Sequence, residues 1–247
     1  MNGDFSELPG KTAIVTGASS GIGRATAQLL AQNGVRVALV SRSRELLEVL
    51  SSTMPGSRAF PADMTSIPQI KKMVGAVAKE LGSIDILINN AGQGYDAGIE
   101  RIDIKTFRHI YDLNVIGPLV AMQQVIPIMK EQGGGSIVNV SSGTALMNLP
   151  GMSPYSSSKR ALAGISLAAR EELNLYGIIV SVVYPYITVT SFEKNTIRAV
   201  PVPDDEMEPT GPYPPDSAEF VAEKIVGGIV SGKAEIFSHD WMKERRV

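Results

Sequence analysis

Short runs rich in β-branched residues alternate with longer amphipathic segments along most of the chain. This alternation constrains the fold strongly, because a parallel strand needs a long crossover, usually a helix, before the next strand can pair with it. We expect strands at residues 12–16, 36–40, 57–62, 85–89, 135–141, 178–184 and 234–237. We expect helices at residues 22–33, 43–53, 66–80, 102–131, 154–176 and 217–230. The sequence therefore predicts an α/β protein with a doubly wound, parallel, seven-stranded sheet and helices on both faces.

No change of composition marks a linker between domains, so we expect residues 1–247 to form a single domain. The segment 199–216 is rich in proline and acidic residues and can form neither a regular helix nor a central strand. It follows the last central strand, near the edge of the sheet where α/β proteins bind ligands. We therefore expect residues 186–216 to form a lid over a substrate, with a disordered surface loop as the alternative for 199–216.

The composition excludes several classes of function. There are no cysteines, so the chain has no disulfides and no thiolate nucleophile or metal ligand. The net charge of -2 and the pI near 5.8 give no broad positive field for nucleic acid or an anionic membrane. His109 and His239 have no partners at metal-ligand spacing, so we expect no metal site. The first residues lack a signal pattern and the apolar runs are too short to span a bilayer, which predicts a cytoplasmic protein.

A glycine-rich turn separates the first expected strand from the first expected helix, with glycines at 17, 21 and 23. Small residues there would let the backbone approach a pyrophosphate, whose charge the positive end of the following helix stabilises. The pattern indicates a Rossmann-type dinucleotide site, although its spacing departs from GxGxxG. The alternative is that the glycines only make the turn tight.

Several further motifs stand in a fixed order along the chain. They are TGASSGIG at 16–23, NNAG at 89–92, Asn114, VNVSS ending at Ser142, and the pair Tyr155 and Lys159. In this order and approximate spacing the chain resembles the short-chain dehydrogenase/reductase family over nearly its whole length. The resemblance implies a single NAD(P)-binding Rossmann-fold domain that transfers a hydride between a nicotinamide and a small carbonyl or alcohol substrate. It also implies a homodimer or homotetramer.

Tyr155 and Lys159 are four residues apart, so they project from one face of the expected helix. A phenol titrates near pH ~10, and acid–base work at neutral pH requires a charge that stabilises the phenolate. A lysine ammonium and an oxidised nicotinamide would supply it. The alternative is an exposed pair worth a few tenths of a kcal/mol. The resemblance implies that Tyr155 is the general acid/base and that Ser142 holds the substrate oxygen; Ser141 is the rival, since adjacent strand residues face opposite ways.

Asn114 precedes Pro118 by four residues within a long helical pattern. Proline has no N–H, so the hydrogen bond from residue 118 to the carbonyl of Asn114 cannot form. The resemblance implies that a water bound at this carbonyl connects to Lys159 as a proton relay. The alternative is that Pro118 only kinks the helix.

The residues after the second expected strand predict the cofactor. Members of the family that prefer NAD usually carry an acidic residue where this chain has Ser41, followed by Arg42. A hydroxyl and a guanidinium can bind a 2′-phosphate, so we expect NADP(H) rather than NAD(H), unless Arg42 is simply solvated. The resemblance implies that Asp63 contacts the adenine; the alternative is that Asp63 caps a helix. The expected cofactor-binding residues are Gly17, Ser19, Ser20, Gly21, Ile22, Gly23, Ser41, Arg42, Asp63, Met64, Asn90, Ala91, Gly92, Tyr155, Lys159, Pro185, Thr188 and Thr190.

The chain departs from the family after the sixth expected strand, where Pro185 is followed by Tyr186 instead of glycine. We expect this ring to narrow the space beside the nicotinamide unless it points away. Apolar residues flank the same region and suggest an apolar substrate, or else core or subunit contacts. They are Leu146, Met147, Leu149, Met152, Ile187 and Phe192.

The motifs together predict an NADP(H)-dependent oxidoreductase that acts on a carbonyl or secondary alcohol. A non-catalytic, dinucleotide-responsive binding or regulatory protein is the alternative, but such a protein has no need of the Asn114, Ser142, Tyr155 and Lys159 set. An epimerase or dehydratase is disfavoured because the chain lacks a sizeable C-terminal substrate domain.

Overall fold

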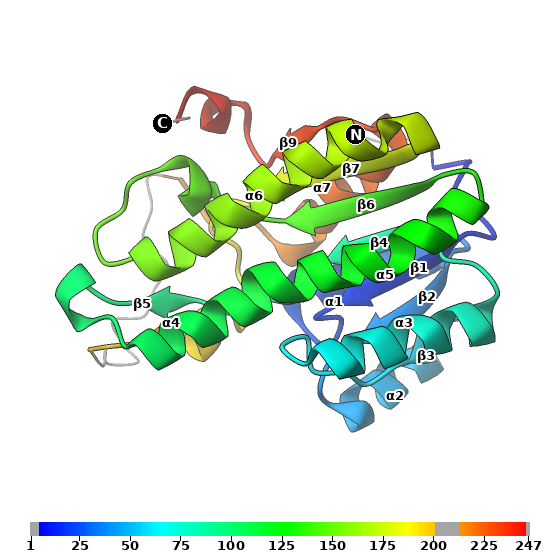
Figure 1. Cartoon of the computed structure of the whole chain (residues 1–247), viewed down its shortest axis with the longest axis horizontal. Helices are drawn as coiled ribbons and strands as arrows, with labels where there is room; N and C mark the ends of the chain where they lie inside the picture. The colour runs from blue at the N-terminus through cyan, green and yellow to red at the C-terminus, as the bar shows by residue number, and fades with distance from the viewer. Residues whose placement is uncertain (1–4, 201–212, 246–247) are drawn as a thin grey trace.

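The computed structural model describes residues 5–200 and 213–245. In this part of the chain seven strands form one parallel sheet with the order β3-β2-β1-β4-β6-β7-β9 (Figure 1). The strands are β1 (Thr12–Thr16), β2 (Arg36–Val40), β3 (Arg58–Ala59), β4 (Ile86–Asn89), β6 (Gly135–Val140), β7 (Ile178–Tyr184) and β9 (Glu235–Phe237). The order reverses between β1 and β4, which confirms the doubly wound, Rossmann-type sheet.

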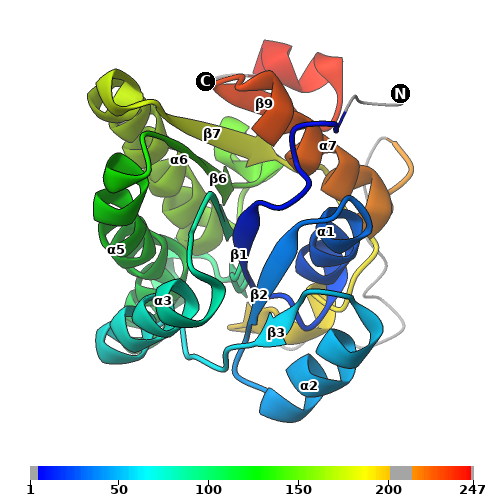
Figure 2. The ribbon, with the colours of Figure 1, turned by 90° about the vertical axis from the view of Figure 1, so that its right-hand side faces the viewer.

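Helices cover both faces of the sheet, as Figure 2 shows. One face carries α3 (Ile67–Leu81), α5 (Gly117–Glu131) and α6 (Ser153–Leu173), and the other carries α1 (Gly21–Gln32), α2 (Arg44–Thr53) and α7 (Ala218–Ser231). The alternation along a strand divides the core accordingly. In β1, Ile14 packs toward the first set, whereas Ala13 and Val15 pack toward the second.

The long helix expected at 102–131 is divided into three parts. It consists of α4 (Ile104–Tyr111), a π-helical turn (Asp112–Ile116) and α5. In the π-helical turn the N–H of Gly117 donates to the carbonyl of Asp112. The missing N–H of Pro118 explains why the regular ladder cannot continue through this turn.

The combined helix Ile104–Glu131 is 28 residues long and reaches a mean hydropathy of 1.2. By length and composition alone this helix could cross a membrane, which is weak evidence because buried core helices have the same properties. Half of the most apolar 18-residue stretch of this helix is buried inside the protein, which is typical of a core helix that packs on a sheet.

Two features differ from the sequence-based expectation. The strand expected at 57–62 contains only two paired residues, because it lies at the edge of the sheet and its sequence includes Pro61. A second, two-stranded parallel sheet of β5 (Tyr95–Asp96) and β8 (Ile197–Arg198) was not predicted. Of the lid expected at 186–216, residues 201–212 lie outside the described residues.

Candidate active site

A cavity of about 900 Å³ opens beyond the carboxyl ends of the strands, where β5 and the starts of α4 and α6 gather on the left of Figure 1. Most of the residues expected at the site line this one cavity, from the glycine-rich turn to the segment after β7. Gly23 and Asn114 lie behind the lining instead. The fold therefore brings together motifs that are widely separated in the sequence.

The glycine-rich turn packs so closely that side chains would not fit. Gly17 and Gly21 have φ angles of 68° and 51°, a region that favours glycine. A Cβ on Gly23 would lie 2.3 Å from the Gly17 carbonyl oxygen and 2.4 Å from Nδ2 of Asn90. The side chain of Ser20, the N-cap of α1, makes no capping hydrogen bond, and Ser20, Gly21 and Ile22 line the cavity. This cradle fits the pyrophosphate of a dinucleotide.

Asn90 ties β4 to β1 at the point where the strand order reverses. Its backbone N–H donates to Oγ1 of Thr16 at 2.9 Å, and its Nδ2 donates to the Thr16 carbonyl at 3.0 Å. The N–H of Ala91 shares the same hydroxyl at 3.0 Å. Thr16 is thus a structural part of the cradle that sequence reasoning missed, although it immediately precedes the first glycine.

Tyr155 lies near the start of α6, and its side chain is 7% exposed. Burial raises the pKa of its phenol, the charges of Glu193 and Asp96 raise it further, and a hydrogen bond with the Ser142 hydroxyl acts in the opposite direction. The lowering expected from Lys159 is therefore not seen in the protein alone, because the cost of burying a phenolate dominates.

Lys159 follows one turn later and is 4% exposed. Its Nζ donates to the carbonyl of Val140 at 2.9 Å and lies 5.9 Å from the centre of the Tyr155 ring. A Cβ on Gly92 would lie 3.2 Å from this nitrogen. Burial lowers the pKa of Lys159 to about 8.

Ser141 and Ser142 have different partners. The hydroxyl of Ser141 donates to the carbonyl of Lys159 at 2.9 Å and so fastens β6 to α6. The hydroxyl of Ser142 accepts hydrogen bonds from the N–H and the hydroxyl of Thr144 at 3.2 and 3.0 Å and interacts with Tyr155. These partners favour Ser142 over Ser141 as the residue that faces the reacting group.

Asn114 is fully buried in the π-helical turn. Its Nδ2 donates to the carbonyl of Gln93 and to the hydroxyl of Ser158, and its Oδ1 accepts from the N–H of Gln93, each at 3.0 Å. Ser158 in turn donates to the carbonyl of Tyr155 at 2.7 Å. The side chain therefore joins the segment after β4 to the helix that carries Tyr155.

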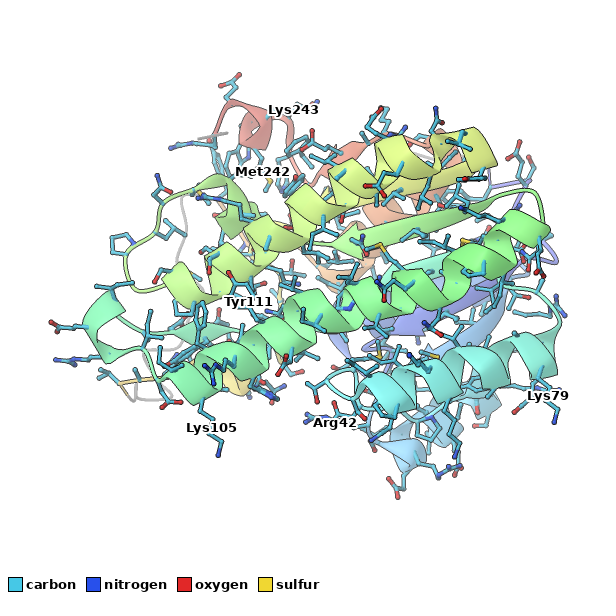
Figure 3. All side chains as sticks on the ribbon, in the orientation of Figure 1. Arg42, Lys79, Lys105, Tyr111, Met242 and Lys243 are labelled. Atoms are coloured by element: carbon cyan, nitrogen blue, oxygen red, sulfur yellow. The ribbon has the colours of Figure 1, made fainter. Side chains whose placement is uncertain are left out.

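The far end of the cavity carries the residues expected at the adenosine. The hydroxyl of Ser41 is buried and has no partner among the described residues, so it can serve a ligand. Arg42 lies near the start of α3 (Figure 3). Burial tends to raise the pKa of Asp63, but hydrogen bonds from Thr65 and the charges of Arg42 and His109 hold it below its ordinary value. Asp63 bonds Thr65 and does not cap α3, whose N-cap is Ser66.

The ring of Tyr186 packs into an aromatic cluster. It meets Tyr213, His239 and Trp241 edge-on at centroid distances of 6.4, 6.0 and 5.4 Å, and it is 8% exposed. Its hydroxyl donates to the carbonyl of Tyr213 at 3.3 Å. The ring therefore packs mainly against other aromatic side chains, although Tyr186 remains part of the cavity lining.

The segment after Tyr186 reaches back over the glycine-rich turn. A Cβ on Gly21 would lie 3.0 Å from Cγ2 of Thr190, whose hydroxyl accepts from the N–H of Phe192. Thr188 donates its hydroxyl to the Tyr186 carbonyl at 2.8 Å. Both threonines line the cavity, and Thr190 lies beside the glycine-rich turn.

Sequence reasoning missed a group of polar lining residues. They are Gln93, Asp96, His109, Glu193, Asn195 and Arg198. No motif marks them. His109 lies in α4, and the other five lie in or beside β5 and β8, which pair only two residues each. Of the apolar residues expected at the pocket, all but Leu146 line the cavity; Leu146 packs in the core beside α6.

Comparison with known proteins identifies the family of the chain. The sequence model of the short chain dehydrogenase family matches residues 11–200. The chain is 37% identical to 3-oxoacyl-(acyl-carrier-protein) reductase FabG of Thermotoga maritima over 197 residues, which are 78% of this chain and 80% of the relative. It is 35% identical to D-threitol dehydrogenase of Mycolicibacterium smegmatis, over 76% of this chain and 73% of the relative.

Solved structures resemble the fold closely. A 3-ketoacyl-(acyl-carrier-protein) reductase from Brucella melitensis, complexed with NADH, superimposes with a TM-score of 0.82 at 27% identity, covering 90% of this chain and 91% of that one. A short-chain dehydrogenase from Streptomyces avermitilis gives 0.84 at 29% identity, covering 95% and 90%. The chain belongs to the short-chain dehydrogenase family. This is a family of oxidoreductases, and its fold binds a nicotinamide dinucleotide.

Proposed function

We propose that the protein is an NADP(H)-dependent oxidoreductase that interconverts a carbonyl compound and a secondary alcohol, with Tyr155 as the general acid/base. The observation that carries this proposal is the buried phenol of Tyr155 in the wall of the dinucleotide cavity, with Ser142 and Lys159 beside it. A regulatory protein that only binds a dinucleotide would not need this group.

Each residue has a separate role in the proposed reaction. Ser142 donates a hydrogen bond to the substrate oxygen and stabilises the negative charge that develops there. Tyr155 gives its proton to that oxygen during reduction and takes it back during oxidation. When bound, the nicotinamide supplies or accepts the hydride and, in its oxidised form, adds a positive charge beside Tyr155.

Lys159 and Asn114 support the proton transfer. The buried ammonium of Lys159 stabilises the phenolate and holds the nicotinamide ribose. Asn114 keeps α6 in register with the segment after β4 and, at the π-helical turn, carries the carbonyl at which a water would relay protons to Lys159. The proton on Tyr155 could then be replaced from solvent after each turnover.

The cofactor preference rests on Ser41 and Arg42. The buried, unpartnered hydroxyl of Ser41 and the adjacent guanidinium suit a 2′-phosphate, which favours NADP(H). The Brucella neighbour was solved with NADH, so the preference needs its own measurement.

Three further properties belong to the same proposal. We expect a small, largely apolar substrate, since Met147, Leu149 and Met152 line the cavity. We expect a cytoplasmic homodimer or homotetramer. Residues 186–216 are proposed to cover the substrate, and the described part of this segment already lines the cavity through Tyr186, Phe192 and their neighbours.

The decisive experiment compares Tyr155→Phe with the unchanged protein. We expect the dissociation constant for NADPH, measured by fluorescence, to change less than about threefold, while the rate of carbonyl reduction falls by about a thousandfold or more. Tyr176→Phe, on an exposed ring outside the cavity, is the matched control. Reduction by Tyr155→Phe at the original rate would contradict the assigned role.

A further inference from the structure

Two segments form a wall over the substrate end of the cavity, and we call residues 93–97 and 191–198 the cavity wall. The parallel pair β5 and β8 joins them, with the N–H of Ile197 donating to the Gly94 carbonyl at 3.0 Å. Nε2 of Gln93 donates to the carbonyl of Asn195 at 2.8 Å. Because Gln93 also bonds Asn114, the wall is fixed relative to the helix that carries Tyr155.

The wall lies directly against the proposed reacting group. The ring of Phe192 is 5.5 Å from the ring of Tyr155, centre to centre. A Cβ on Gly94 would lie 2.5 Å from Oγ1 of Thr196 and 3.2 Å from Cε1 of Phe192, so the two segments are in close contact. A substrate bound at Tyr155 therefore meets the side chains of this wall.

Three charged side chains of the wall line the cavity: Asp96, Glu193 and Arg198. Two carboxylates and one guanidinium give this end a net negative charge. The charges of both carboxylates raise the pKa of Tyr155, as expected of acidic groups that line the same cavity as the phenol.

Arg198 is not available as an anchor for an anionic substrate. Its Nη2 lies 2.6 Å from Oε2 of Glu193, and its Nη1 donates to the carbonyl of Glu193 at 3.0 Å. Its Nε lies 3.8 Å from Oδ2 of Asp96. The side chain of Arg198 is only 15% exposed, compared with 34% for Asp96 and 45% for Glu193. The two carboxylate side chains are therefore more exposed than the guanidinium that pairs with them, although all three line the cavity.

The nearest other cations are also engaged. Nζ of Lys159 donates to a backbone carbonyl inside the protein. The guanidinium of Arg160 donates to the carbonyls of Ala145 and Met147 and is not part of this lining. Lys194 belongs to the wall but is exposed and does not line the cavity. Among the described residues that line the substrate end, the cations are Arg198 and Lys159, and both are engaged inside the protein.

We infer that Asp96 and Glu193 determine substrate charge: they disfavour compounds with a carboxylate or phosphate close to the reacting carbonyl and favour uncharged or cationic ones. This inference rests on the proposed function, because it assumes that the substrate binds at Tyr155. The two carboxylates are specificity-determining groups and have no part in the chemical step.

The test uses three ketones of similar shape: 3-acetylbenzoate, 3-acetylbenzamide and the 3-acetylphenyltrimethylammonium ion. We expect the unchanged protein with NADPH to reduce the amide with a kcat/KM about tenfold above that of the carboxylate. Glu193→Gln and Asp96→Asn should each raise the kcat/KM for the carboxylate several-fold relative to that for the amide, and lower the kcat/KM for the cation relative to that for the amide. Glu131→Gln, an exposed acid at the end of α5, is the charge-matched control.

Affinity separates this inference from the proposed reaction. In the Tyr155→Phe background the same three ketones are titrated calorimetrically with NADPH present, so the ranking is measured without turnover. A carboxylate that binds as well as the amide, including the case in which neither binds measurably, overturns the inference. A ranking that neither Glu193→Gln nor Asp96→Asn alters overturns it as well. Failure of the unchanged protein to reduce any of the three ketones, with the ranking of their affinities intact, would instead count against the proposed function.

Discussion

The amide of Asn114 donates a 3.0 Å hydrogen bond to the hydroxyl of Ser158, one turn from Tyr155 and adjacent to Lys159. This bond crosses from the π-helical turn to α6, and the same amide also binds both backbone groups of Gln93. One buried side chain thus fixes the relative position of three separate segments around the cavity.

Asn114→Ala should weaken both stability and turnover. It leaves the N–H and carbonyl of Gln93 without their partner, and we expect the free energy of unfolding to fall by about 2–3 kcal/mol. Turnover should fall more than NADPH affinity, because α6 loses its fixed position. Asn33→Ala, which removes one bond at the end of α1, is the control and should cost less than about 1 kcal/mol in urea unfolding. Equal losses in the two variants would contradict the linking role.

Gly23→Ala should be severely destabilising and should abolish dinucleotide binding. The added Cβ would meet the Gly17 carbonyl oxygen at 2.3 Å, and this atom belongs to the backbone and cannot move aside cheaply. Gly75→Ala, in the middle of α3 with nothing within 4 Å of the added Cβ, should instead raise the free energy of unfolding by about 0.5–1 kcal/mol. Thermal unfolding and NADPH titration of both variants check the contrast, and a neutral effect at Gly23 would refute the close packing of the turn.

Arg42→Ala should change the cofactor preference. If Arg42 binds a 2′-phosphate, its loss should weaken NADPH by about 10- to 100-fold and leave NADH within about twofold. Arg44→Ala is the control, since Arg44 pairs with Glu48 on the surface of α2, outside the cavity lining. Parallel titrations with both cofactors check this, and an equal loss for NADPH and NADH would count against recognition of the phosphate.

Because of Lys159, the free energy of unfolding of the cofactor-free protein should be higher at moderately alkaline pH than at neutral pH. Its pKa is lowered from 10.5 to about 8, so the unfolded chain binds more protons than the folded protein between these values and stability rises with pH. We expect a gain of about 2 kcal/mol from pH ~7.5 to ~9.5, which Lys159→Met should remove. Above pH ~10 the raised pKa of Tyr155 acts in the opposite direction, because the unfolded phenol then loses its proton first. Urea unfolding at each pH gives the free energy of unfolding as a function of pH. The same dependence on pH in the unchanged protein and in Lys159→Met would rule out this titration.

Tyr186 should matter chiefly through its ring. Tyr186→Gly removes a buried aromatic side chain from the cluster with Tyr213 and Trp241, and we expect the protein to lose about 3–5 kcal/mol of stability. Tyr186→Phe removes only the hydroxyl contacts with Tyr213 and should cost less than about 1.5 kcal/mol. The fluorescence of Trp241, the only tryptophan of the chain, reports the unfolding directly. A Tyr186→Gly protein as stable as Tyr186→Phe would show that the cluster contributes little.

The alternating pattern predicted the sheet well, because buried parallel strands and crossover helices have distinct periodicities. The strand that includes Arg58 was predicted too long, since an edge strand with a nearby proline pairs only in part. The break near Asn114 could be inferred from Pro118, but the sequence does not indicate that a π-helical turn accommodates it.

The residues that line the cavity were predictable where they belong to contiguous motifs, and not where they meet through tertiary contacts. Asp96 and Arg198 face each other across two strands of two residues each, which leave no periodic signal. The direction of the Tyr155 pKa was also missed, because spacing alone indicates the neighbouring lysine and says nothing of how deeply the phenol is buried.

The C-terminal turn supports the segment that carries Ser142. Met242, labelled in Figure 3, packs so near the adjacent glycine that a Cβ on Gly143 would lie 2.8 Å from its Cε. An affinity tag or fusion partner placed at this end of the chain would disturb the contact between Met242 and Gly143, and with it the position of the proposed oxyanion-binding hydroxyl of Ser142. Purification handles for kinetic work are therefore better placed at the opposite terminus.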